Sequence, residues 1–171
     1  MSNALEQMYQ QVILDHAKYP HGRGLPAGSG GTTALATAPH PGCGISHQVN
    51  PTCGDEVTLR VDVDRSGDLP RVEDVRWEGQ GCSISQASIS VLRDLVVGQD
   101  LPTVDRLAAS FRELMGSRGA GLHDDEAADA LGDAMAFTGV SRYPARIKCA
   151  LLGWAALSDA LILSGAREDA S

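Results

Sequence analysis

The chain has 171 residues, 43% of them hydrophobic, and carries a formal net charge of −8. This length and apolar content allow one domain with its own core. The acidic balance argues against non-specific nucleic-acid binding, which depends on Lys and Arg contacts to phosphate. No apolar run reaches the roughly 20 residues of a membrane span, and the opening Met-Ser-Asn-Ala-Leu-Glu-Gln lacks the plan of a signal peptide. We therefore expect a cytoplasmic protein that keeps its thiols reduced.

The first half of the chain predicts a helix, a loop and a small sheet. Apolar residues recur at helical spacing over residues 3–18, and the Gly- and Pro-rich residues 20–42 predict a long loop. Residues 56–64 alternate strictly between apolar and polar side chains, which predicts a half-buried antiparallel strand. A second strand at 72–79 and a weaker one at about 46–50 complete a predicted three-stranded meander.

The second half predicts helices. The period changes at residue 83 to that of a helix ending near Gly98, and further helices are expected around 103–115 and 125–137. Pro144 is well placed to open a last helix. Strands followed by helices indicate the α+β class, here about three antiparallel strands packed by four to six helices. We find no internal repeat, so residues 1–171 are predicted to form a single domain.

Three of the four cysteines stand at predicted element boundaries, and Asp55 accompanies one of them. Cys53 and Asp55 precede the strand at 56–64, Cys82 lies between a strand and a helix, and Cys149 lies in the first turns of the last helix. Element ends that are far apart in sequence can converge at one edge of a sheet. In a reducing compartment, such cysteines are metal ligands or catalytic groups more often than disulfides.

These four residues suit zinc, which takes four ligands in a tetrahedron and accepts thiolates and carboxylates. Gly54 permits a tight backbone that turns both of its neighbours toward one ion. Cys82 is expected at a helix N-terminus, where the partial positive charge favours a thiolate. Three thiolates and a carboxylate would repel one another without a cation. The competing interpretation is that the cysteines are small buried hydrophobes, and their wide spacing is not that of a zinc ribbon.

The other cysteine and the histidines give weaker signals. His40, Cys43 and His47 would allow a second metal site, but we favour the simpler view that Cys43 is an incidental loop thiol. His16 is predicted on the surface of the N-terminal helix and His123 in a polar segment, neither with a functional role. The His-x-Glu and Cys-x-x-Cys pair of a zinc deaminase is absent.

Three motifs resemble those of one family. They are Asn-Pro-Thr-Cys-Gly-Asp at 50–55, Glu-Gly-Gln-Gly-Cys-Ser-Ile-Ser at 78–85 and Pro-Ala-Arg-Ile-Lys-Cys-Ala at 144–150. Together with the opening helix around residues 8–16, they look like the SufU branch of the IscU/NifU-like iron–sulfur assembly proteins. IscU proper has a His where this chain has Lys148, and a Leu-Pro-Pro-Val-Lys segment that is missing here. Residues 98–140 resemble the insertion of the SufU branch.

The resemblance implies a zinc-dependent sulfurtransferase that accepts persulfide sulfur from a SufS-type cysteine desulfurase. It implies zinc ligands Cys53, Asp55, Cys82 and Cys149, with Arg146 as a neighbour of the site. We expect Cys53 to be the nucleophile, because it follows a long flexible loop. Two alternatives remain open: a scaffold on which the same thiolates assemble a [2Fe–2S] cluster, and an adaptor domain whose zinc is purely structural.

Overall fold

The computed structural model describes residues 3–25 and 41–167, and its elements follow the predicted order of a helix, a sheet and further helices. The elements are α1 (Asn3–Lys18), β1 (Cys43–Val49), β2 (Glu56–Asp64), β3 (Arg71–Gln80), α2 (Ser83–Val96), α3 (Leu101–Met115), α4 (Asp125–Leu131), the 3₁₀ segment η2 (Gly132–Arg142) and α5 (Pro144–Leu163). The predicted α+β class is confirmed. Most of the loop predicted at 20–42, and with it His40, lies outside the described residues.

The three strands form an antiparallel meander in the order β1–β2–β3. The strict alternation of β2 places Val57, Leu59 and Val61 in the core, where each is fully buried. Leu59 stands opposite Ser46 of β1 on one side and Trp77 of β3 on the other. The strand that the sequence predicted weakly at about 46–50 is β1, which begins earlier, at residue 43.

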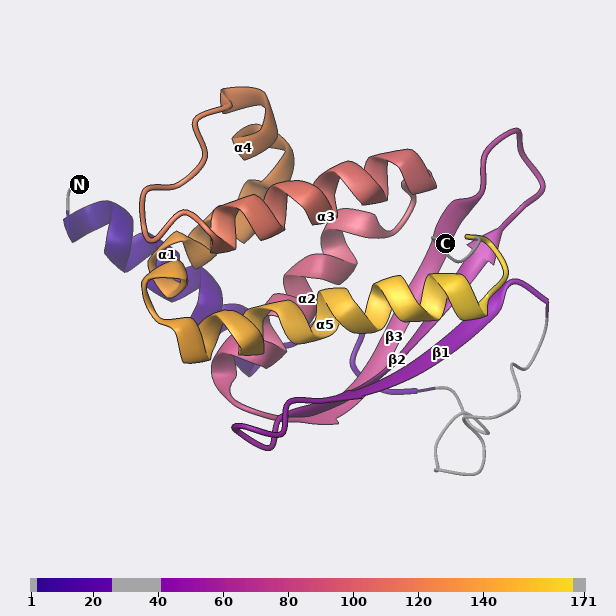
Figure 1. Cartoon of the computed structure of the whole chain (residues 1–171), viewed down its shortest axis with the longest axis horizontal. Helices are drawn as coiled ribbons and strands as arrows, with labels where there is room; N and C mark the ends of the chain where they lie inside the picture. Colours follow the sequence, from indigo (N-terminus) through magenta and orange to yellow (C-terminus); the bar gives the residue numbers. More distant parts are fainter. Residues whose placement is uncertain (1–2, 26–40, 168–171) are drawn as a thin grey trace.

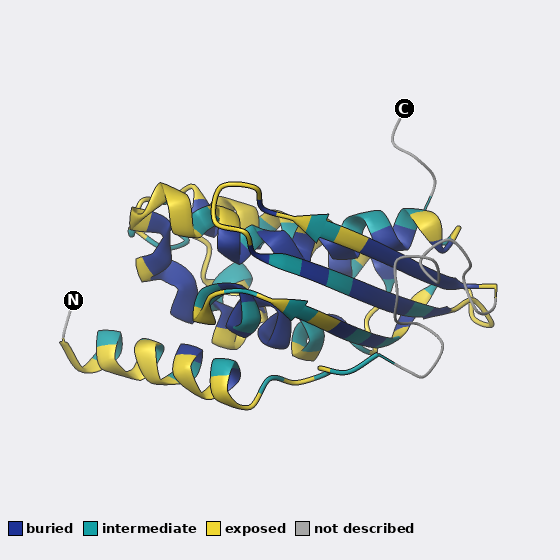
Figure 2. Cartoon of the chain, turned by 90° about the horizontal axis from the view of Figure 1, so that it is seen from below, coloured by how far each residue is buried: buried dark blue, intermediate teal, exposed yellow. Residues whose placement is uncertain are grey.

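Helices cover one face of the sheet, which gives the molecule two layers (Figure 1). α5 packs across β1 and β2, α2 packs on β3, and α1 lies against α2 and η2. Figure 2 shows the buried residues gathered between strands and helices, whereas α1 leaves much of its length exposed. The helices α2 and α5 therefore lie between the sheet and the outer helices, and their N-terminal ends adjoin the loops at one end of the sheet.

The helix predicted at 125–137 is interrupted. α4 ends at Leu131, and Gly132 adopts φ 49° and ψ −120°, after which the chain continues as the 3₁₀ segment η2. A positive φ is readily available only to glycine, so Gly132 ends the α-helix although its neighbours Ala, Leu and Met favour one.

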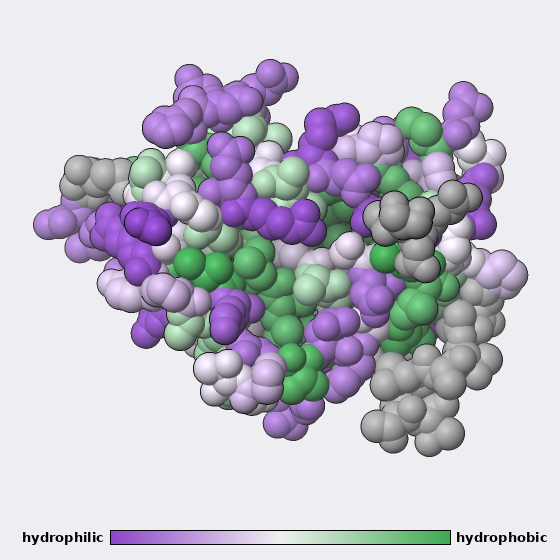
Figure 3. Space-filling view, in the orientation of Figure 1, coloured by the Kyte–Doolittle hydropathy of each residue, from purple (hydrophilic) through white to green (hydrophobic). Residues whose placement is uncertain are grey.

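The surface seen in Figure 3 is mainly hydrophilic, with apolar side chains exposed in the middle of the face. None of the described helices has the length and the hydropathy that a membrane span requires.

Candidate metal centre

A tight turn before β2 holds Cys53 and Asp55. The turn is closed by hydrogen bonds from Gly54 N to Asn50 O (2.8 Å) and from Asn50 N to Asp55 O (2.7 Å). The Asn50 side chain also accepts a hydrogen bond from Thr52 N at 3.1 Å. Gly54 has φ 75°, a left-handed conformation that allows the tight backbone expected there. Cys53 is left exposed, whereas Asp55 is only 5% exposed.

Asp55 reaches the N-terminus of α2. Its Oδ1 accepts a hydrogen bond from the backbone N–H of Cys82 at 3.2 Å, and its Oδ2 lies 3.4 Å from Cys82 Sγ. Cys82 is the N-cap residue of α2, so the carboxylate also lies at the positive end of the helix dipole. These contacts tie the β2 turn to α2.

Cys149 joins the cluster from α5. Its Sγ lies 3.6 Å from Cys53 Sγ, and the thiol itself is buried. The ligand atoms of Cys53, Asp55 and Cys149 all lie within 4.8 Å of one another. The structure therefore brings together all four residues that the sequence singled out, from three separate parts of the chain.

Two groups of this cluster have shifted pKa values. Burial is the main cause that raises the pKa of Cys149, and its hydrogen bonds with Asp55, Cys53 and Cys82 raise it further. Burial would also raise the pKa of Asp55, but hydrogen bonds from Cys149, Cys82 and Cys53, and from the Cys82 backbone, hold it below its usual value. Metal-free, Cys149 thus keeps its proton and Asp55 keeps its negative charge.

A divalent cation fits this arrangement. Metal binding releases thiol protons, and the positive ion offsets the mutual repulsion of the thiolates. Three sulfurs and one carboxylate oxygen make a donor set that tetrahedral zinc accepts. Cysteine thiolates also suit an iron–sulfur cluster, so the donor set alone does not distinguish zinc from such a cluster. That the four residues are ligands stays a prediction.

Arg146 lies on the exposed side of the first turn of α5. Its guanidinium carbon lies 5.6 Å from the centre of the Tyr143 ring, within range of a cation–π contact. The predicted role of Arg146 beside the centre is not tested by this contact.

Cys43 is not a loop thiol, so that prediction was wrong. It is the first residue of β1, stands opposite Asp62 of β2 and is 1% exposed. Burial raises its pKa to about 11. His47 of the same strand lies 2.8 Å from Thr58 Oγ1 and 3.9 Å from a Glu56 carboxylate oxygen. The site imagined from His40, Cys43 and His47 cannot be assembled from described residues, since His40 is outside them.

No role was predicted for Ser85, and the surface position predicted for His16 was wrong. Ser85 Oγ lies 4.0 Å from Cys82 Sγ and donates to the Cys82 carbonyl at 3.0 Å. A hydroxyl three residues after a cysteine at a helix start was the available signal. His16, predicted at the surface of α1, is instead 8% exposed and lies 2.7 Å from Ser90 Oγ of α2. The helical pattern of α1 alone does not reveal that α2 covers this position.

Comparison with known proteins identifies the family of the chain. Residues 8–150 match the NifU-like N-terminal domain family. The zinc-dependent sulfurtransferase SufU of Bacillus subtilis (strain 168) is 39% identical over 153 residues, covering 90% of this chain and 88% of that protein. The iron–sulfur cluster assembly scaffold protein IscU of Streptococcus pyogenes serotype M1 is 34% identical, covering 92% and 84%.

Solved structures share the fold. A protein described as an iron–sulfur cluster assembly scaffold for the SUF system of Fervidobacterium islandicum AW-1 superposes with a TM-score of 0.70 at 29% identity, covering 91% of this chain and 98% of that one. The N-terminal part of a NifU-like protein from Brucella abortus gives a TM-score of 0.69 at 21% identity, covering 94% and 96%. The chain therefore belongs to the NifU-like N-terminal domain family and, within it, to the SufU-type branch of the iron–sulfur cluster assembly proteins.

Proposed function

We propose that this protein, acting as a single domain, is a zinc-dependent sulfurtransferase that accepts persulfide sulfur from a cysteine desulfurase. The observation that carries the proposal is the contrast between two thiols 3.6 Å apart: Cys53 is exposed, and Cys149 is buried. An exposed thiol in a ligand cluster is able to meet a partner's persulfide without the fold opening. The name of the Bacillus subtilis relative supports the same activity.

The residues of the chain have separate tasks in this proposal. Cys53, Asp55, Cys82 and Cys149 would hold the zinc, which when bound would keep the thiols deprotonated at neutral pH. Cys82 and Cys149 are fixed by the starts of α2 and α5, so they keep the ion in place. Cys53 lies in the Gly54 turn outside any helix or strand, which makes it the ligand best able to leave and react.

The transfer step balances as a thiol–disulfide exchange. The Cys53 thiolate attacks the outer sulfur of the desulfurase persulfide, and a new S–S bond forms on Cys53. The S–S bond of the donor breaks, and its electron pair leaves with the desulfurase cysteine as a thiolate. The hydrogen of the outer sulfur stays with that sulfur, so no external oxidant or reductant is needed.

Sulfur acceptance by variants tests the assignment. The zinc-loaded protein is mixed with a desulfurase and cysteine, and mass spectrometry follows the gain of one sulfur atom on the peptide that contains Cys53. Cys53→Ser should abolish the gain, whereas Cys43→Ala, which changes a cysteine outside the cluster, should retain it. Normal sulfur acceptance by Cys53→Ser would sink the assignment.

A cluster scaffold is the second candidate, favoured by the name of the Streptococcus pyogenes relative. In that case the same four residues hold a [2Fe–2S] cluster, and Asp55 is the weaker ligand that eases its release. Anaerobic challenge of the purified protein with ferrous iron and sulfide separates the two. Zinc retained at the cysteine centre supports the transferase, and a visible cluster that an apo-ferredoxin can strip supports the scaffold.

A further inference from the structure

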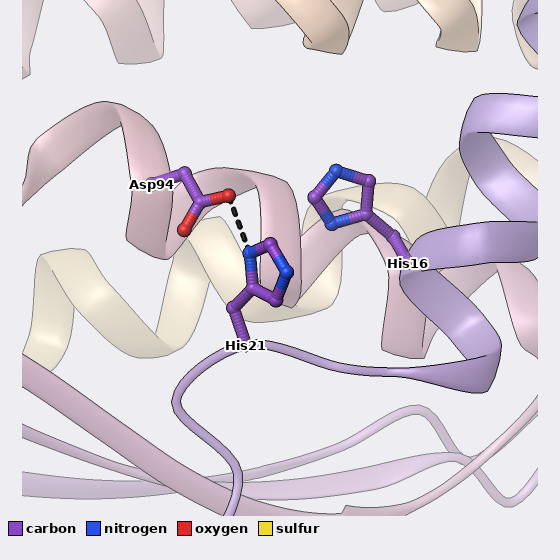
Figure 4. Close-up of side chains that lie close together, drawn as sticks. All are labelled: His16, His21 and Asp94. Atoms are coloured by element: carbon purple, nitrogen blue, oxygen red, sulfur yellow. Dashed lines mark hydrogen bonds and ion pairs between the residues drawn. The ribbon is translucent and has the colours of Figure 1, made fainter.

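A second group of metal-binding side chains lies at the opposite end of α2 from Cys82. Figure 4 shows His16 on α1, His21 on the segment after α1 and Asp94 on α2 lying close together. One ligand atom from each of the three lies within 4.8 Å of the other two. Asp94 follows Cys82 by twelve residues, which is roughly 18 Å along a helix axis. This cluster is therefore separate from the cysteine centre.

Ser90 contacts the ring of His16 and the backbone of His21. Its Oγ lies 2.7 Å from His16 Nδ1 and accepts a hydrogen bond from the backbone N–H of His21 at 2.8 Å. When His16 Nδ1 carries the hydrogen and donates it to Ser90, Nε2 keeps its lone pair. Metal-binding histidines commonly have this arrangement, in which the second ring nitrogen donates to a neighbouring oxygen. His16 is buried, so its ring is held in this orientation by packing.

A carboxylate lies on the side toward which His16 Nε2 faces. Asp133 Oδ2 lies 3.6 Å from that nitrogen. His16, Asp94 and Asp133 line a cavity of about 100 Å³ together with two apolar residues of α2. This cavity exceeds the roughly 30 Å³ that one water molecule occupies in the liquid. It therefore has room for an ion and solvent beside His16, Asp94 and Asp133, whereas His21 lies outside its lining.

Asp94 is held in place by a cation on its other side. Its Oδ1 lies 3.9 Å from Arg93 Nη1, and its Oδ2 lies 2.5 Å from His21 Nδ1. The His21–Asp94 contact is a hydrogen bond whose proton a metal ion would displace. A simple ion pair explains this contact, but it does not explain why buried His16 lies beside the same carboxylate and lines a cavity with it.

We propose that His16, His21 and Asp94, with Asp133 beside them, bind a second divalent transition-metal ion through nitrogen and oxygen. Two imidazoles and a carboxylate suit zinc and also ferrous iron, whose sites commonly use two histidines and one carboxylate. Zinc and ferrous iron are both divalent cations of intermediate softness, so the same ligands suit either ion. The net charge of −8 favours its approach.

Imidazole nitrogen shifts give a direct test. The ¹⁵N-labelled full chain is titrated with zinc, and the ring nitrogens are followed by long-range ¹H–¹⁵N correlation. We expect His16 and His21 to move together, whereas His47 and His123 stay fixed. Because the readout is the histidine ring, it reports this site whether or not the cysteines take the first equivalent. Anaerobic titration with ferrous iron shows which of the two metals binds more tightly.

Variants give the second measurement. His21 and Asp94 have exposed side chains, at 50% and 39%, so His21→Ala and Asp94→Asn should leave the fold intact. Each should weaken zinc binding at this site by about tenfold or more. His47→Ala is the matched control, since His47 is also a half-exposed histidine beside a carboxylate. Circular dichroism confirms that each variant folds.

Two results would overturn the proposal. One is a titration through three equivalents of zinc in which the ring nitrogens of His16 and His21 do not move. The other is a second zinc ion bound equally well by wild type, His21→Ala and Asp94→Asn. Loss of zinc from the cysteine centre alone would count against the proposed sulfurtransferase and would leave this inference standing.

Discussion

Cys53 and Cys149 lie 96 positions apart in the sequence, yet their sulfur atoms are 3.6 Å apart. One comes from the turn before β2 and the other from the second turn of α5. Because α5 packs across β1 and β2, the contact depends on how the last helix docks on the sheet. The chemistry of this pair is therefore a property of the packed fold.

Thiol alkylation should separate the cysteines into two groups. Cys53 and Cys82 are exposed, whereas Cys43 and Cys149 are buried and have raised pKa values. In the metal-free protein at pH 7.5 to 8 or so, the exposed pair should react first with N-ethylmaleimide, since the thiolate is the reactive form. Peptide mapping by mass spectrometry gives the order. Modification of Cys43 as fast as Cys53 would contradict the burial described here.

Asp55→Asn should weaken metal binding by about tenfold or more, because it keeps the shape of the side chain but removes its charge. Competition with a chromophoric chelator measures the change in affinity. Asp64→Asn is a suitable control, since Asp64 lies at the exposed end of the same strand. Equal affinities for the two variants would show that the Asp55 carboxylate is not a ligand.

Alkaline stability should depend on Cys43. Burial raises its pKa from an ordinary 9.0 to about 11 in the folded protein. Because the folded protein favours the protonated thiol, the contribution of Cys43 to the free energy of unfolding is complete below pH 9 and is lost as the pH rises toward 11. Over that interval the wild type should lose about 2 to 3 kcal/mol more stability than Cys43→Val, which cannot ionise. Urea unfolding at several pH values measures the difference, and parallel losses in both proteins would argue against it.

The N-terminal cap of α3 should make the stability of the protein depend on pH in acidic solution. The side chain of Asp100 accepts a hydrogen bond from Thr103 N at 2.9 Å, and hydrogen bonds with the Thr103 side chain and backbone hold its pKa below the usual value. A lowered pKa means that the stabilisation is present above about pH 4 and is lost as the pH falls through the folded value. Asp100→Ala should lower the urea midpoint at pH 7.

The difference in urea midpoint between the wild type and Asp100→Ala should shrink as the pH falls below about 4, because the wild-type carboxylate then becomes protonated. Asp100→Ser retains a cap without a titrating group. Its midpoint should therefore stay closer to that of the wild type at pH 7. A difference in midpoint that is independent of pH would mean that the charge of Asp100 contributes nothing to stability.

Most of the fold was predictable because local patterns agree with the packing. The strict alternation of β2, the period change at residue 83 and Pro144 at the start of α5 each mark an element that the structure contains. The break at Gly132 was missed because the surrounding residues favour a helix, and only the backbone of one glycine decides against it. β1 begins at Cys43, earlier than predicted, because pairing with β2 recruits residues that carry no strand signal of their own.

The cysteine cluster was predictable because each member marks an element boundary, but the histidine cluster was not. His16, His21 and Asp94 belong to separate segments without a shared motif, and their convergence follows from the packing of α1 on α2. The burial of His16 likewise depends on its partner Ser90, 74 positions along the chain. Such long-range contacts leave no periodic trace in a single sequence.

The order of the four residues along the chain has a consequence for synthesis. A chain emerging from the ribosome presents its N-terminal parts first, so Cys53, Asp55 and Cys82 precede Cys149 by more than sixty positions. A nascent chain can pair its strands and form α2 while it still holds an incomplete set of donors. If all four residues are ligands, closure of the centre must wait for α5, and metal retention would then distinguish a finished molecule from a prematurely terminated one.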